Sequence, residues 1–139
     1  MSSLLSERAR RMLSKSLPLF QAHKHEVIDR MQPCLELAEP DQNPGQSEVN
    51  AMILVEMLVN QGRHLLDTGK LDDLAHIPSE HAALQITGRT YSRFGDVLVP
   101  ILKDVFGPNV PSMVPGLWCD TFWRIIRAAR SAHPVLEAA

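Results

Sequence analysis

The stretch from residue 81 to residue 107 reads HAALQITGRTYSRFGDVLVPILKDVFG, and it decides the fold. Large apolar side chains recur in it three and four positions apart, at Tyr91, Phe94, Leu98 and Leu102. That spacing places them on one face of an α-helix, and the Gly-Pro pair at 107 and 108 is a helix stop signal. We therefore expect a helix over residues 90–106. A short helix that begins near Pro78 and carries His81 should precede it, because proline is tolerated in a first helical turn.

The same helical spacing continues through the rest of the chain. Further helices are expected over residues 6–21, 23–37, 47–66 and 111–132, with Pro33 kinking or shortening the second. Residues 39–45 read EPDQNPG, a cluster of turn formers that predicts a loop. No Asn-Gly or Asp-Gly hairpin signal lies between alternating apolar runs, so the sequence predicts an all-α protein.

Composition limits the class of partner. The 139 residues suit one domain spanning 1–139, and the net charge of −2 argues against nucleic acid as a partner. The longest apolar run, residues 51–55, is far shorter than the roughly 20 residues of a membrane-spanning helix. Cys34 and Cys119 lack a metal-binding spacing, and the first residues lack the apolar run of a secretion signal. The expectation is a cytoplasmic protein with no membrane partner.

His81 is the histidine with the most unusual surroundings. It stands between two long apolar helices, whereas His23, His25 and His64 lie in polar surroundings. Taken by spacing alone, a lone histidine beside an apolar helix is more often an ordinary interior residue than a metal ligand. His81 is nevertheless the candidate that the sequence offers for metal binding.

A longer pattern resembles a known family. His81 is followed by Ile86, Tyr91 and Gly95, and then by the Phe-Gly pair at 106 and 107. In this order and spacing the residues resemble the proximal half of bacterial globins of the flavohaemoglobin and single-domain type. Leu117, Trp118 and Phe122 match further positions in the last helix of that family. The resemblance implies a globin fold of about six or seven helices, packed two over two around one pocket.

The resemblance also implies a cofactor and its ligand. The cofactor would be haem b, bound without covalent attachment because the chain has no Cys-x-x-Cys-His motif, and His81 would be the axial ligand of its iron. Tyr91 matches a tyrosine that hydrogen-bonds near the proximal imidazole. The residues implied to line the proximal side are Ile86, Phe94 and Leu98.

The distal side departs from the family. Gln32 stands where a distal tyrosine is usual, and the loop at 39–45 contains no phenylalanine. On the third long helix either Gln46 or Ser47 takes the distal position, the first favoured by its chemistry and the second by register. The residues that follow on the implied haem face are Ala51, Val55 and Leu58.

Two functions follow from this resemblance. The first is a haem protein that binds a diatomic gas, oxygen or nitric oxide, and that supports nitric oxide detoxification only with a separate reductase. The second is a globin-like sensing or interaction module, with no haem or with another apolar ligand in the pocket. The missing loop phenylalanine and the replaced tyrosine favour the second. A homodimer is an open alternative to a monomer in either case.

Overall fold

The computed structural model describes residues 6–132, which form six α-helices and no β-strand. In chain order the helices are α1 (Glu7–Ala22), α2 (Lys24–Ala38), α3 (Pro44–Thr68), α4 (Ile77–Ala83), α5 (Gly88–Phe106) and α6 (Val114–Ala132). The prediction of an all-α protein is therefore confirmed.

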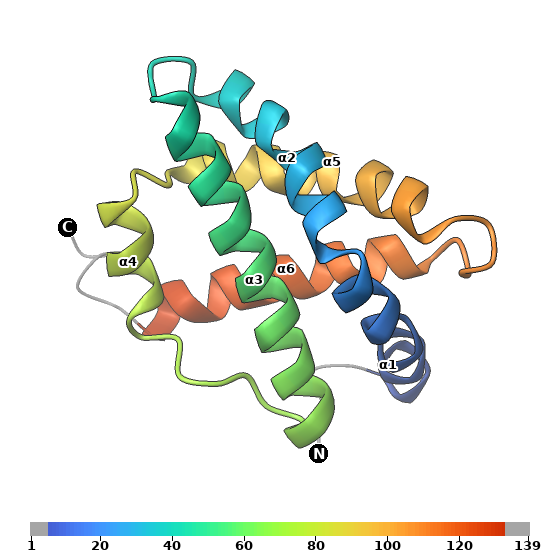
Figure 1. The fold of residues 1–139 in the computed structure, drawn as a ribbon. Coiled ribbons are helices and arrows are strands. Elements are labelled where there is room, and N and C mark those ends of the chain that lie inside the picture. Colours follow the sequence, from blue (N-terminus) through green and yellow to red (C-terminus); the bar gives the residue numbers. More distant parts are fainter. Residues whose placement is uncertain (1–5, 133–139) are drawn as a thin grey trace.

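Four long helices make the body of the protein. Helices α2 and α3 pack on each other and lie across α5 and α6, with α2 against α5 and α3 against α6 (Figure 1). Helix α1 packs on α3 and α6 at one end of this arrangement. The short helix α4 lies at the other end, where it contacts α6 (Figure 1). Helices α1 and α4 therefore lie at opposite ends of the four-helix body.

Trp118 is the centre of the contact between α1, α3 and α6. Its ring is fully buried, lies edge to face on Phe20 with 5.0 Å between ring centroids, and donates from Nε1 to Oγ of Ser16 at 2.8 Å. A Cβ atom added at Gly62 of α3 would lie 2.7 Å from Cζ3 of this ring. Because that distance is too short for two carbons, a residue without a side chain is required where α3 passes Trp118.

The helix ends follow local sequence signals. Oγ of Ser6 accepts a hydrogen bond from the amide of Ala9 at 3.1 Å, which caps α1 where the sequence predicts its start. Thr87 and Thr90 form a reciprocal cap, so α5 begins two residues earlier than expected. It ends as predicted before Gly107, whose φ is 77°.

Helix α2 spans Lys24–Ala38, close to the predicted 23–37, and it is not shortened at Pro33. The proline and Asp29, whose carbonyl loses its helical donor, are both exposed. Two other boundary predictions were wrong. Helix α3 begins at Pro44, inside the predicted loop, because proline suits the first turn. Helix α6 begins at Val114 instead of Pro111, since the Val114 amide first closes a turn onto the Pro111 carbonyl at 3.0 Å.

Candidate functional site

His81 is an interior residue of the short helix α4. Its side chain is 3% exposed, and Ile77, one turn earlier on the same face, is 5% exposed. Pro78 lies in the first turn, as predicted. The helix stops two residues after His81, and the backbone turns back so that the amide of Ile86 donates to the His81 carbonyl at 2.9 Å. This short helix therefore fixes His81 with its ring in the core.

The side chain of Tyr91 holds one nitrogen of that ring. Oη of Tyr91 lies 2.6 Å from Nδ1 of His81, and both side chains are buried. Tyr91 itself comes from the second turn of α5, whose start is fixed by the cap at Thr87. The contact leaves Nε2 as the ring nitrogen that a metal would use. With a metal on Nε2, Nδ1 would carry the ring proton and donate a hydrogen bond to Oη of Tyr91, which would fix the tautomer.

Both groups are held in their neutral forms by burial. Removal from water lowers the pKa of His81 below its usual 6.5, an effect that Glu80 opposes and His76 reinforces. Burial raises the pKa of Tyr91 to about 12, against a smaller lowering by Arg130. The guanidinium carbon of Arg130 lies 5.5 Å from the centre of the Tyr91 ring, a cation–π contact. At neutral pH the pair is therefore an uncharged imidazole beside a protonated phenol.

A cavity of about 210 Å³ opens beside Tyr91, and His81 does not line it. Ile86 and Tyr91 line it together with Gly88 at the start of α5 and Arg130 of α6. Nothing in the sequence is a reason to name Arg130, because it lies forty-nine positions after His81 with no motif around it. It comes near this site because α6 packs on α4.

Gln46 does not face an open space. Its amide nitrogen donates to the carbonyl of Leu84 at 3.0 Å and to Oδ1 of Asn50 at 2.8 Å. Gln42 makes a parallel contact, donating to the carbonyl of Gln85 at 2.8 Å. The two glutamines tie the start of α3 to the end of α4 and so position the helix that carries His81.

Ser47, the other candidate for the distal position, is buried with 1% exposure. Its Oγ is the one buried side-chain oxygen or nitrogen within the described residues that has no hydrogen-bond partner. Leaving a buried hydroxyl unpaired costs about 1–3 kcal/mol. This hydroxyl is accordingly the distal candidate that is still free to bond a ligand.

Gln32 lies on α2 and is half-buried. Its amide nitrogen contacts Oε2 of Glu36, one turn later on the same helix, at 3.4 Å. Nothing in this contact brings Gln32 to His81 or to Ser47, so the structure does not join it to the proximal pair.

The apolar residues expected around the cofactor are all in the core. None is more than 5% exposed, and all belong to one buried cluster shared by α3, α5 and the residues after α4: Ala51, Val55, Leu58, Ile86, Phe94 and Leu98. Phe94 also packs on Phe122 of α6, with 4.5 Å between ring centroids. The cluster supplies the apolar setting that a large flat cofactor needs, and it is also what ordinary helix packing produces.

Within the described part of the chain, His81 is a single candidate donor rather than part of a cluster of metal-binding side chains. Among residues 6–132 there is no group of three His, Cys, Asp or Glu side chains that could hold an ion. Haem brings four nitrogen ligands of its own and needs one axial ligand from the protein. His81, a buried histidine with Nδ1 engaged, is the residue of this structure that would serve as such a ligand.

Comparison of the chain with protein-family models, with curated proteins and with solved structures finds no match. Within the described part of the chain, no helix is long and apolar enough to span a bilayer.

Proposed function

We propose that the protein is a haem-binding globin that reversibly binds a diatomic gas, oxygen or nitric oxide. The observation that carries the proposal is the 2.6 Å contact between Nδ1 of His81 and Oη of Tyr91 inside the core. Axial histidines of haem proteins need their second ring nitrogen held by a hydrogen bond, which fixes the tautomer and the ring orientation. The resemblance in sequence implies this role for both residues, and the geometry agrees with it.

The helix arrangement also supports a globin. Two long helices, α2 and α3, lie across α5 and α6, while the helix with His81 is short and lies to one side. The resemblance implies a two-over-two packing, and this crossing of helix pairs supports the proposal. Gln42 before α3 and Gln46 in its first turns bond the two carbonyls that follow α4, so they would help to fix the position of His81.

Haem b would supply the iron at which the gas binds. The chain would supply Nε2 of His81 as the axial ligand, with Tyr91 as its positioning residue through Nδ1. The unpaired hydroxyl of Ser47 would donate to a polar group bound in the core. Nitric oxide detoxification also needs reducing equivalents, for which we propose a separate reductase.

One further function is favoured by a specific observation. The side-chain amides of Gln46 and Gln32 are engaged elsewhere, and the expected apolar lining is fully packed. A globin-like sensing or interaction module, without haem or with another apolar ligand, would have such an interior. The two proposals differ in whether the core accepts haem.

Hemin titration of the purified protein separates them. The wild type should saturate at one haem per chain with a Soret band, and the pyridine haemochrome should be that of haem b. His81→Ala should lose or strongly shift the band. His76→Ala is the matched control, since His76 is exposed and precedes the same helix, and it should behave as the wild type.

Two outcomes would overturn the proposal. If the wild-type protein is folded, as shown by cooperative unfolding, but does not bind hemin, the result would favour the module without haem. An unchanged spectrum in His81→Ala would show that another residue is the ligand.

A further inference from the structure

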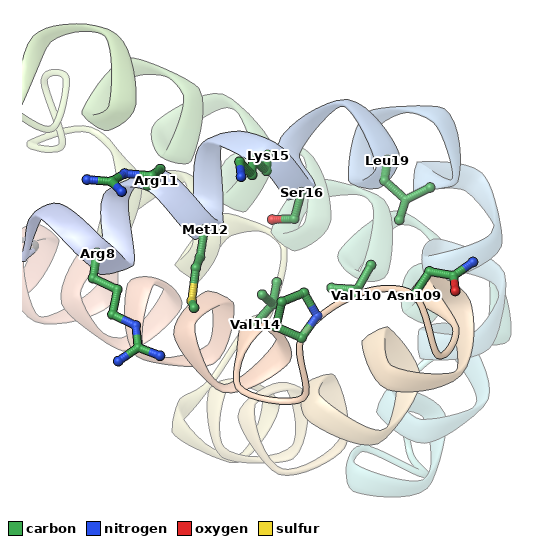
Figure 2. Close-up of a pocket in the computed structure, with 10 residues that line it drawn as sticks. Arg8, Arg11, Met12, Lys15, Ser16, Leu19, Asn109, Val110 and Val114 are labelled. Carbon is green, nitrogen blue, oxygen red and sulfur yellow. The ribbon is translucent and has the colours of Figure 1, made fainter.

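A second cavity lies at the end of the molecule far from His81. It has a volume of about 400 Å³ and lies between α1 and residues 109–114, which comprise the end of the α5–α6 connection and the first residue of α6 (Figure 2). Helix α4 stands at the opposite side of the fold (Figure 1). This cavity is therefore separate from the proposed haem site, and its volume falls within the range of small-molecule sites, about 300–1,000 Å³.

The floor of the cavity is apolar. Met12 and Leu19 of α1 are half-buried, as is Val110, and Val114 at the start of α6 is 1% exposed. Figure 2 shows Met12 directed from α1 toward the side on which Val114 lies. Ser16 also lines the cavity, but its hydroxyl is already satisfied: it donates to the Leu13 carbonyl and accepts from Trp118. An occupant of the floor would thus meet almost only hydrocarbon.

The rim on the α1 side is cationic. Arg8, Arg11 and Lys15 line the cavity three and four positions apart, and all three are exposed. Among the residues that the structure describes, no acidic side chain lines the cavity. Within residues 6–132 none of the three cations takes part in an ion pair. Like charges at these spacings on a helix repel one another, so an anion bound among them would relieve that repulsion.

The opposite rim carries no charge. Asn109, Val110 and Pro111 form it. A positive edge on one side only, above an apolar floor, is complementary to a molecule with one anionic end and an apolar remainder. The protein as a whole carries a net charge of −2, so this positive edge is a local feature.

We propose that this cavity binds a single-chain anionic amphiphile, a fatty carboxylate. The carboxylate would lie among Arg8, Arg11 and Lys15, where guanidinium groups offer paired donors to its two oxygens. The hydrocarbon chain would lie on Met12, Leu19, Val110 and Val114. A cavity of about 400 Å³ has room for a single alkyl chain, whereas an amphipathic peptide helix would need an extended groove.

Calorimetric titration with sodium decanoate below its micelle concentration tests the proposal. Decanoate should bind once per chain, and decanol and acetate, which lack the charge or the chain, should bind much more weakly. Binding of decanoate should weaken as salt is added, because the cationic rim is exposed and therefore screened.

Two variants locate the site. Arg8→Gln/Arg11→Gln/Lys15→Gln should raise the dissociation constant of decanoate at least about tenfold, since charge-assisted bonds to the carboxylate are lost. Val110→Glu should do the same by placing a carboxylate in the cavity. The matched control, Arg63→Gln/Lys70→Gln/Arg89→Gln, removes three exposed cations elsewhere and should bind as the wild type. Unchanged helical circular dichroism will show that each variant is folded.

Several results would overturn this inference. One such result is no binding of decanoate by the wild type. Another is the same dissociation constant for decanoate in the wild type and in Arg8→Gln/Arg11→Gln/Lys15→Gln. Preferential binding of an acidic peptide, with no binding of decanoate, would assign the cationic rim to a protein partner. His81→Ala should bind decanoate as the wild type does, so the inference can fail or hold independently of the haem proposal.

Discussion

Oη of Tyr91 lies 2.6 Å from Nδ1 of His81, and the two side chains come from different helices, ten positions apart in the chain. The contact joins α4 to α5 in the core and leaves one imidazole nitrogen for a ligand. Both side chains are buried and neutral. Their burial can be tested by titration of Tyr91, by the pH dependence of stability and by ligand binding.

Tyr91 is the one tyrosine of the chain, so its ionisation can be measured directly. Burial raises its pKa to about 12 from 10.0. We expect the near-ultraviolet absorbance of tyrosinate to rise in the folded protein with a midpoint near that value, and near 10.0 in the protein unfolded by urea. Equal midpoints in the two states would show that the hydroxyl is open to water.

His81 should make the apo protein sensitive to acid. Its folded pKa is lowered below 6.5, so the unfolded state binds the proton more readily. The stabilisation from burying neutral His81 is complete above pH 6.5 and is lost as the pH falls through the lowered folded pKa. The free energy of unfolding, measured by urea denaturation at several pH values, should therefore fall less steeply below pH 6.5 in His81→Gln than in the wild type.

Gly62 should not tolerate a side chain. In Gly62→Ala the new methyl would lie 2.7 Å from Cζ3 of Trp118, a buried ring with no room to move, and we expect a loss of about 1–3 kcal/mol in unfolding free energy. Gly116→Ala in α6 is the control, because nothing lies within 4 Å of its added Cβ. That control should be neutral or more stable by up to about 1 kcal/mol, because alanine has the higher helix propensity.

Ser16 should stabilise the fold through its hydrogen bond with Trp118. Ser16→Ala leaves the buried indole N–H without its partner, which should cost about 1–3 kcal/mol. Ser14→Ala, on the exposed face of the same helix, should change stability by less than about 0.5 kcal/mol. If thermal unfolding shows equal stability for the two variants, the hydrogen bond is not what holds α1 to α6.

The sequence predicted the helices and most of the core because their signals are local. The face of Val27, Ile28, Met31 and Leu35 is buried as the periodicity predicts. The end of α5 at Gly107 follows from a glycine at φ 77°. The prediction was wrong at Pro44, where proline begins α3 instead of lying in a loop. At Pro33 the helix continues past a proline whose surroundings are exposed, and the sequence does not show that exposure.

The candidate site was predictable in part. The resemblance to bacterial globins implied a contact between Tyr91 and the imidazole of His81, and the structure brings these two side chains together. The contacts of Gln46 with Leu84 and Asn50 depend on how α3 meets α4, which no local pattern encodes. Likewise Gly95 is explained only by α6, since an added Cβ would lie 2.7 Å from Cζ2 of Trp123.

The most direct test of the haem proposal is the iron–histidine stretching band in the resonance Raman spectrum of the ferrous, hemin-reconstituted protein. The band should be present in the wild type and should shift in Tyr91→Phe, which removes the hydrogen bond at Nδ1. In His81→Gly it should be absent and should return when imidazole is added. A band that persists in His81→Gly without imidazole would contradict the assignment of His81 as the axial ligand.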